Sequence, residues 1–263
     1  MTEAQIRFDD GDAYEPYMGD WSQRVGRDFL VWLAPPPGLK WIDVGCGNGA
    51  FTELVVERCE PAEVCGIDPS EAQLAFARKR PAARLAKFDR GDAMALPFPA
   101  DTFDAAVMAL VIFFVPDPAK GVAEMVRVVR SGGVVAAYAW DMLGGGFTLE
   151  PIRSEMLRLG IAPINPPSVE ASRIETMRQL WMGAGLIEVE TRQITVSRTF
   201  ANFEEFWQIT LSGSAGLRPT LATMSPAAAD QLKARVRERL HVDAGGPVTY
   251  ESRANAIKGR VPA

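Results

Sequence analysis

Residues 43–49 read Asp-Val-Gly-Cys-Gly-Asn-Gly, and this D-x-G-x-G-x-G stretch decides the fold of the chain. Residues 39–44, which are mostly apolar, predict a strand, and residues 50–59 predict a helix that begins directly after the last glycine. Glycines at such a junction permit a tight turn and let a ligand approach the backbone, while the first helical turn offers free N–H groups. The stretch therefore indicates a nucleotide-type ligand held between a strand and a helix.

Expected strands and helices alternate along the first half of the chain. Strands are expected at residues 63–67, 85–88, 103–108, 134–140, 186–199 and 248–257, and helices at residues 21–33, 71–79 and 118–129. The glycines at residues 132–133 are expected to end the last of these helices. Alternation of this kind is typical of a parallel sheet covered on both faces. We predict an α/β fold with a Rossmann-like, doubly wound, mostly parallel seven-stranded sheet and a final antiparallel strand.

The pattern changes after residue 140. Residues 142–167 are rich in Gly and Pro, and helix starts are indicated at Asn202 and at Ser225, which is followed by Pro226. We interpret these segments as insertions that form a mainly helical cap over the sheet. The expected division is a ligand-binding core with an N-terminal lid segment at 1–140, a cap insertion at 141–172, a core helix and strand at 173–200, a helical cap insertion at 201–246, and a final strand and tail at 247–263.

The composition restricts the class of partner. Hydrophobic residues make up 48% and charged residues 23% of the 263 residues, which is ordinary for a folded protein. A net charge of −5 argues against a nucleic-acid partner, which favours a basic face. The longest apolar run, residues 105–115, is shorter than the roughly 20 residues of a membrane-spanning helix. A membrane span is therefore not expected. A signal peptide is not expected either, because the N-terminus is acidic and lacks an apolar core.

The few cysteines and the single histidine bear on the cellular location and on the possible metal sites and catalytic bases. Three cysteines without a CxxC pair favour a reducing environment, so a cytoplasmic location is expected. With His241 as the only histidine, no metal site is expected, and most histidine-based triads are excluded unless His241 is the base. Asp141 and His241 are the candidate bases, but a loop carboxylate and a surface histidine are the favoured interpretations.

Three carboxylates narrow the ligand class. Asp68 ends the second expected strand, 21 residues after Gly47, where it can accept from the hydroxyls of a ribose. Asp92 ends the third strand, where it can meet an adenine. Asp43 suits a cation rather than a pyrophosphate, and S-adenosylmethionine carries an ammonium and a sulfonium without a phosphate. Gly45, Gly47 and Ala50 also satisfy the dinucleotide pattern G-x-G-x-x-A, so an NAD(P)-dependent oxidoreductase stays an alternative.

Four ordered segments carry a resemblance to a known family. They read WIDVGCGNGAF at 41–51, VCGIDPS at 64–70, GDAMALPFPADTFDAAVM at 91–108 and VRVVRSGGVVAAY at 126–138. The set resembles the successive motifs of class I S-adenosylmethionine-dependent methyltransferases, and it is most similar to the ubiquinone/menaquinone-biosynthesis-like (methyltransferase type 11) group. The resemblance extends from about Tyr14 to Trp140 and is weak beyond.

The resemblance implies S-adenosyl-L-methionine as cofactor, S-adenosyl-L-homocysteine as product, and a set of binding residues. Its glycine motif, which holds the methionine part, falls on Asp43, Gly45, Cys46, Gly47, Asn48 and Gly49. Its ribose and adenine contacts fall on Asp68, Pro69, Gly91, Asp92 and Ala93. Residues that line the cofactor after the fourth strand fall on Ala109 and Leu110, and an N-terminal segment that closes over the cofactor falls on Tyr17, Met18 and Trp21.

The function expected from these features is methyl transfer to a small molecule by in-line displacement, with an N, O, S or C atom as nucleophile. Related sequences often carry a polar residue or histidine near Phe113 and Phe114, so this chain is expected to present an apolar wall there. Together with the Phe, Trp, Leu and Met content of the expected cap, this wall indicates an apolar or aromatic acceptor. A non-catalytic S-adenosylmethionine-binding protein stays a further alternative, and neither a catalytic residue nor an oligomeric state is assigned.

Overall fold

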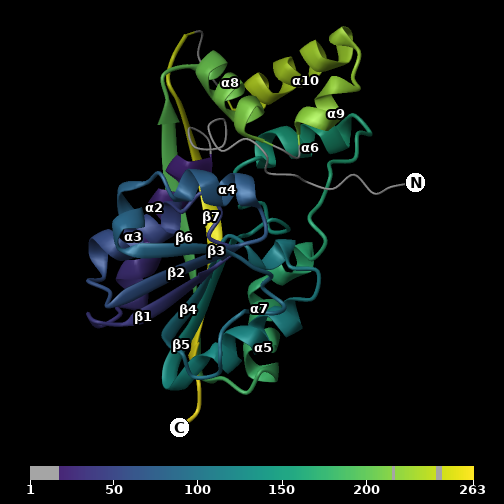
Figure 1. Cartoon of the computed structure of the whole chain (residues 1–263). Helices are drawn as coiled ribbons and strands as arrows, with labels where there is room; N and C mark the ends of the chain where they lie inside the picture. Colours follow the sequence, from purple (N-terminus) through teal and green to yellow (C-terminus); the bar gives the residue numbers. More distant parts are fainter. Residues whose placement is uncertain (1–17, 215–216, 241–244) are drawn as a thin grey trace.

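The computed structural model describes residues 18–214, 217–240 and 245–263 of the chain. Seven strands form one central sheet (Figure 1). Their bounds are β1 Lys40–Val44, β2 Glu63–Asp68, β3 Ala86–Arg90, β4 Phe103–Ala109, β5 Val129–Trp140, β6 Ile187–Phe200 and β7 Val248–Arg260. The strand order is β3-β2-β1-β4-β5-β7-β6, and β7 runs antiparallel to its neighbours β5 and β6. The predicted mostly parallel sheet with one antiparallel final strand is confirmed.

Helices cover both faces of this sheet. Their bounds are α2 Asp20–Leu33, α3 Ala50–Arg58, α4 Glu71–Ala77, α5 Pro118–Val128 and α7 Ile174–Gly183. The pair α2 and α3 packs on one face, and the pair α5 and α7 packs on the other (Figure 1). Trp21, Val25 and Phe29 recur every four residues and are buried, because this spacing places them on one side of α2.

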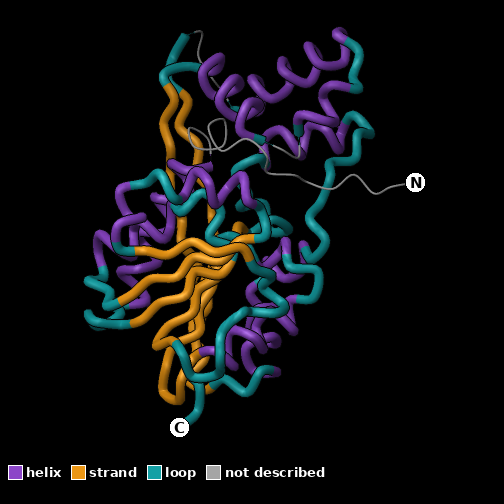
Figure 2. The backbone as a smooth tube through the Cα atoms, in the orientation of Figure 1, coloured by secondary structure: helices purple, strands orange, loops and turns teal. Residues whose placement is uncertain are grey.

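Strands β6 and β7 continue past the sheet as a two-stranded ribbon (Figure 2). Strand β5 pairs with β7 up to Trp140↔Ala254, whereas β6 stays paired with β7 as far as Phe200↔Val248. Because Trp140 is the carboxyl end of β5, the ribbon leaves the sheet at its carboxyl edge. Ligands bind at this edge in open α/β sheets.

Four helices, here called the cap helices, lie together beside the far end of the ribbon (Figure 1). They are α6 Glu150–Arg158, α8 Phe203–Gly213, α9 Arg218–Ala222 and α10 Pro226–Arg239. Helix α8 begins at its predicted cap, since Asn202 Oδ1 accepts a hydrogen bond from the Glu205 N–H at 3.0 Å. Helix α10 begins likewise, since Ser225 Oγ accepts from the Ala228 N–H at 3.3 Å. Within the described ranges, no helix is long and apolar enough to cross a membrane.

The junction of α5 and β5 differs from the sequence-based expectation. Helix α5 already ends at Val128, because Val129 is buried in the sheet and pairs with Phe103 of β4. The expected helix-stop glycines therefore lie inside β5. The register of β5 against β4 shifts just after Phe103, and Gly132, with a φ of +74°, lies among the additional residues. The short helix α9 was not predicted from the sequence.

Candidate functional site

The glycine loop, residues 45–49, connects β1 to α3 at the carboxyl edge of the sheet. The Gly45 N–H donates to the Ile67 carbonyl at 2.7 Å, which ties the loop to β2. Gly45 has a φ of +77°, and a Cβ on it would lie 2.5 Å from Val111 Cγ1. Gly47 has a φ of +52°, but no atom of residues 18–214, 217–240 or 245–263 lies within 4 Å of its Cβ position. Glycine is thus required at Gly45 by packing against Val111, and at Gly47 it leaves open space.

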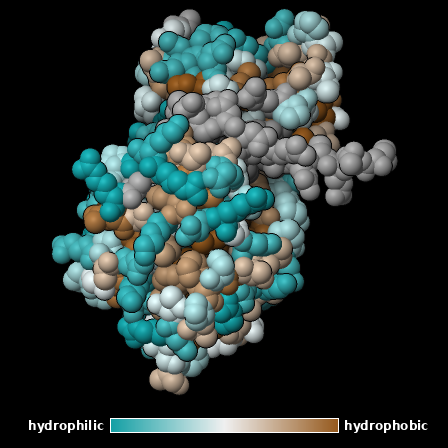
Figure 3. Space-filling view, viewed as in Figure 1, coloured by the Kyte–Doolittle hydropathy of each residue, from teal (hydrophilic) through white to brown (hydrophobic). Residues whose placement is uncertain are grey.

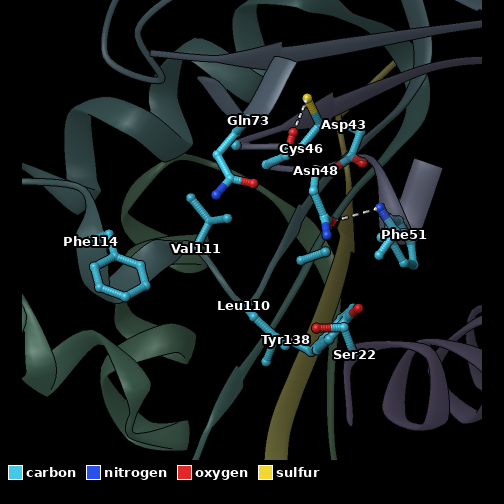
Figure 4. A pocket seen from close by; sticks show the side chains of 14 residues that line it. Ser22, Asp43, Cys46, Asn48, Phe51, Gln73, Leu110, Val111, Phe114 and Tyr138 are labelled. Carbon is cyan, nitrogen blue, oxygen red and sulfur yellow. Dashed lines mark hydrogen bonds between the residues drawn. The ribbon is translucent and has the colours of Figure 1, made fainter. Parts of the chain in front are cut away.

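A pocket lies between this loop and the end of β4 (Figure 4). It encloses about 630 Å³, counting the part that is open to solvent. Helix α2 contributes Ser22 to its wall, α4 contributes Gln73, and β5 contributes Tyr138. The full lining is Ser22, Asp43, Gly45, Cys46, Gly47, Asn48, Ala50, Phe51, Gln73, Ala109, Leu110, Val111, Phe114 and Tyr138. The pocket therefore joins elements from both halves of the parallel sheet.

Asp43 supplies a buried carboxylate to the pocket wall. Its Oδ2 accepts a hydrogen bond from Thr52 Oγ1 at 2.6 Å. Its Oδ1 is buried and has no hydrogen-bond partner among the residues that the structure describes. Burial raises the pKa of Asp43 to about 7; the hydrogen bond from Thr52 opposes this rise and the charge of Asp68 adds to it. A buried acceptor beside a pocket favours a ligand group that donates hydrogen bonds and carries positive charge.

Asp68, at the end of β2, fixes the glycine loop from a second direction. Its Oδ2 accepts from the Gly47 N–H at 2.9 Å, and its Oδ1 accepts from the Ser70 N–H at 2.8 Å. Burial raises the pKa of Asp68, and the two backbone hydrogen bonds act against that rise. Each carboxylate oxygen has a second lone pair. The side chain therefore holds the loop and keeps acceptor capacity for a ligand hydroxyl.

The structure brings part of the expected binding set into the pocket wall. The expected residues in the wall are Asp43, Gly45, Cys46, Gly47, Asn48, Ala109 and Leu110. The expected residues outside the wall are Met18, Trp21, Gly49, Asp68, Pro69, Gly91, Asp92 and Ala93. Tyr17 lies outside the described residues. Contact of all of these residues with a cofactor stays a prediction.

The expected adenine side lies beside Asp68. The Gly91 N–H donates to the Asp68 carbonyl at 3.2 Å, so the ends of β2 and β3 are adjacent. Asp92 is exposed, and its Oδ1 accepts from the Met94 N–H at 2.8 Å. In this structure Asp92 therefore stabilises the turn after β3, and its carboxylate is accessible from solvent.

The N-terminal end of α2 covers the pocket from the side of the ribbon. Trp21 is buried edge-on against Trp140 of β5 and Tyr250 of β7, with ring centroids 6.1 Å and 6.0 Å apart. Its neighbour Ser22 lines the pocket. Trp21 therefore positions the start of α2 against the sheet and the ribbon rather than facing the pocket itself.

Several wall residues were not named from the sequence. Tyr138 is fully buried, and its ring packs 4.7 Å from Phe29 and 5.7 Å from Phe51, measured between centroids. Its position near the carboxyl end of β5 is the signal that could have identified it. Phe51 and Gln73 each lie in the first turn of the helix that follows a motif. No sequence pattern predicts that Ser22 lines the pocket, because its position depends on how α2 packs.

The side chain of Asp141 makes two polar contacts that hold the loop after β5. Its Oδ2 pairs with Arg253 Nη2 at 2.5 Å, and its Oδ1 accepts from the Gly144 N–H at 3.0 Å. This arrangement ties the loop after β5 to β7 and supports the interpretation as a loop carboxylate. The other candidate base, His241, lies outside the described residues.

The basic side of α10 pairs with acidic residues of the cap helices. Lys233 and Arg237 contact Glu204 of α8 at 2.6 Å and 2.5 Å, and Figure 3 shows hydrophilic surface over α8. Arg235 and Arg239 lie 3.6 Å and 3.7 Å from the buried carboxylate of Glu155 on α6. These pairs connect α10 to two neighbouring helices, which accounts for the basic residues without an acidic ligand.

Comparison with known proteins identifies the class of this domain. Residues 42–137 match the family described as a methyltransferase domain. A 96-residue stretch is 45% identical to 2-methyl-6-phytyl-1,4-hydroquinone methyltransferase 2 of Oryza sativa, and covers 36% of this chain and 28% of the relative. A 139-residue stretch is 36% identical to the ubiquinone/menaquinone biosynthesis C-methyltransferase UbiE of Cereibacter sphaeroides, and covers 50% of this chain and 55% of the relative.

The fold comparison agrees with that class. Phosphoethanolamine N-methyltransferase 2 of Haemonchus contortus, solved with S-adenosyl-L-methionine, superposes with a TM-score of 0.59 at 20% identity over 95% of this chain and 56% of that one. Residues 42–137 therefore match a methyltransferase domain, which confirms the resemblance drawn from the sequence motifs. The matched stretches span 28% and 55% of the length of these two curated relatives.

Proposed function

We propose that the whole chain is an S-adenosylmethionine-dependent methyltransferase that acts on an apolar or aromatic small molecule. The observation that carries this proposal is Oδ1 of Asp43, which is buried in the pocket wall beside the glycine loop and has no hydrogen-bond partner within the described ranges. A carboxylate there repels the phosphates of a dinucleotide and attracts an ammonium group. S-adenosylmethionine has an ammonium group and no phosphate.

The other residues of the site fit the same cofactor. The free lone pairs of Asp68 suit the two hydroxyls of a ribose, and the open space at Gly47 admits a ligand against the backbone. When bound, the cofactor supplies a methyl group that its sulfonium activates for displacement. The residues of this chain bind, orient and exclude water. Such positioning accounts for on the order of 7–11 kcal/mol of barrier lowering in well-aligned reactions.

The proposed acceptor class follows from the pocket wall near β4. Leu110, Val111 and Phe114 make this side of the pocket apolar. The names of the two curated relatives specify a phytyl hydroquinone and the biosynthesis of ubiquinone and menaquinone, which supports an apolar or aromatic acceptor. The cap helices lie outside the matched residues 42–137, and we infer that they select the particular acceptor.

Calorimetric titration with S-adenosylhomocysteine, with NAD in parallel, tests the proposal. S-adenosylhomocysteine keeps the ammonium and the ribose but cannot transfer a methyl group. We expect it to bind and NAD not to bind. Binding of NAD alone would replace the proposal with an oxidoreductase, and binding of neither would contradict it. Labelled methyl transfer to a panel of hydroquinones and phenols then separates an enzyme from a non-catalytic binding protein.

The raised pKa of Asp43 predicts that cofactor binding depends on pH. In the free protein the carboxyl group is half protonated near pH 7. A bound ammonium group favours the carboxylate, so binding releases a proton. We expect the affinity for S-adenosylhomocysteine to fall as the pH is lowered from 8 to 6, by at most about tenfold per pH unit. Calorimetry across this range measures the slope.

The variant Asp43→Asn tests the assignment of this slope. It retains an oxygen that can accept from Thr52 but cannot titrate, so its affinity should be lower at pH 8 and nearly independent of pH. Because the folded pKa is raised above the usual 3.8, the charged side chain lowers stability as the pH rises from about 4 to 7. The stability of Asp43→Asn relative to the wild type should therefore increase with pH. The exposed Asp28→Asn is the matched control, and an unchanged slope in Asp43→Asn would assign the titration to another group.

A further inference from the structure

We propose that Arg80 is a positioning residue for the cofactor pocket, because it holds the Asn48 carbonyl of the glycine loop. This inference rests on the proposed function. Arg80 follows α4, and its Nε donates to the Asn48 carbonyl at 2.7 Å. Its Nη1 contacts Glu53 Oε2 on α3 at 2.8 Å. One guanidinium therefore connects the end of α4, the loop and the first turn of α3.

The Arg80–Glu53 pair differs from most ion pairs of the described residues by its burial. The two side chains are 9% and 12% exposed, and the guanidinium also lies 5.4 Å from the ring centroid of Phe76. Removing two charges from water is expensive, and a well-packed apolar pair often gives equal or greater stability. The pair therefore contributes little to stability. Its more specific effect is to hold Arg80 where it donates a hydrogen bond to the loop.

The bond lies at the position where the loop needs support. Asn48 stands between two glycines, which have the greatest backbone freedom to lose. Its side chain lines the pocket (Figure 4), and its Oδ1 accepts from the Ala50 N–H at 3.3 Å. Asp68 holds the Gly47 N–H on one side, and Arg80 holds the Asn48 carbonyl on the other. These two anchors fix successive residues of the loop before a ligand arrives, which lowers the ordering cost of binding.

The substitution Arg80→Lys tests the role of the planar guanidinium group, which contacts both Asn48 and Glu53. Lysine keeps a positive charge for Glu53, but its compact ammonium cannot reproduce both contacts of the planar guanidinium. We expect the affinity for S-adenosylhomocysteine to fall about tenfold, the effect of losing one hydrogen bond to a charged group. In the ligand-free protein, amide hydrogen exchange at residues 47–50 should accelerate, while exchange in β5 stays as in the wild type.

Two further variants complete the experiment. Arg130→Lys is the matched control, because Arg130 bonds Asp104 and the Ser131 carbonyl at the opposite edge of the sheet. It should leave both readouts unchanged. Glu53→Gln retains the bond from Arg80 to Asn48, so it should change the affinity less than threefold. A similar loss in Glu53→Gln would show that the ion pair, and not the loop bond, is responsible.

The outcomes separate this inference from the proposed function. Wild-type affinity and loop exchange in folded Arg80→Lys would overturn the positioning role. If the wild type binds no S-adenosylhomocysteine, the proposed function fails, while faster exchange at residues 47–50 in Arg80→Lys still supports the loop anchor. If Arg80→Lys does not fold, Arg80 is a stability residue and the inference fails.

Discussion

Replacing Gly47 with alanine should weaken S-adenosylhomocysteine binding by about 5- to 150-fold while the protein stays folded. Among the residues that the structure describes, no atom lies within 4 Å of the added Cβ, so the substitution creates no clash with them in the ligand-free protein. The φ of +52° is nevertheless unfavourable for alanine, at a cost of about 1–2 kcal/mol. The Cβ would occupy the space through which we propose that the cofactor approaches the loop, and overlap of this kind costs about 1–3 kcal/mol in packed sites. Calorimetry and thermal unfolding measure the two effects separately.

Gly38→Ala is the matched control for this prediction. Gly38 has a φ of +79°, and no atom of the described part of the chain lies within 4 Å of its Cβ position. It lies before β1, at the amino edge of the sheet. Both variants should lose similar stability, because they share the unfavourable backbone conformation. Only Gly47→Ala should lose affinity. Equal affinities in the two variants would place the cofactor away from the glycine loop.

The fold and the loop could be predicted because their signals are local. The glycine loop, the capping residues Asn202 and Ser225, and the apolar strands each depend on neighbours within a few residues. A parallel sheet then brings the carboxyl ends of its strands to one edge. This geometry alone places Asp43 and Asp68 close together, although 25 residues separate them in the sequence.

The remaining parts of the site depend on contacts that no local pattern encodes. Arg80 and Asn48 are 32 residues apart, and arginine at a helix end ordinarily indicates a solvated side chain. Tyr138 looks like any aromatic residue in a buried strand, and Ser22 like any small residue on a helix. Their roles follow from how α2, α4 and β5 pack around the loop.

The glycines at residues 132–133 illustrate the opposite error, a correct local rule that tertiary structure overrides. Glycine after an apolar helix ordinarily predicts a helix end. Here the burial of Val129 and its pairing with Phe103 begin the strand earlier, and the glycines serve the register shift instead. Strand pairing across the sheet decides the boundary between α5 and β5, and the sequence around the helix end does not encode that pairing.

Removing the Asp68 carboxylate, which lies beside the pocket wall, should weaken cofactor binding more than any other substitution proposed for this site. Asp68→Ala leaves the Gly47 and Ser70 N–H groups without their acceptor and removes the proposed acceptor for the ribose hydroxyls. Hydrogen bonds to a charged group contribute about 1.5–3 kcal/mol each. Loss of two ligand bonds therefore predicts an affinity at least about 100-fold lower. The freed N–H groups should also lower the free energy of unfolding by about 1–3 kcal/mol.

Asp68→Asn separates the two roles of this side chain. Its single oxygen can accept from one of the two backbone N–H groups, but its NH₂ group faces the other donor and repels it. We expect a smaller loss of stability than in Asp68→Ala and a comparable loss of affinity, because the ribose hydroxyls need both carboxylate oxygens. Asp89→Ala, an exposed aspartate on the neighbouring strand β3, is the control and should match the wild type. If Asp68→Asn binds S-adenosylhomocysteine like the wild type, the carboxylate acts on the loop alone and the ribose lies elsewhere.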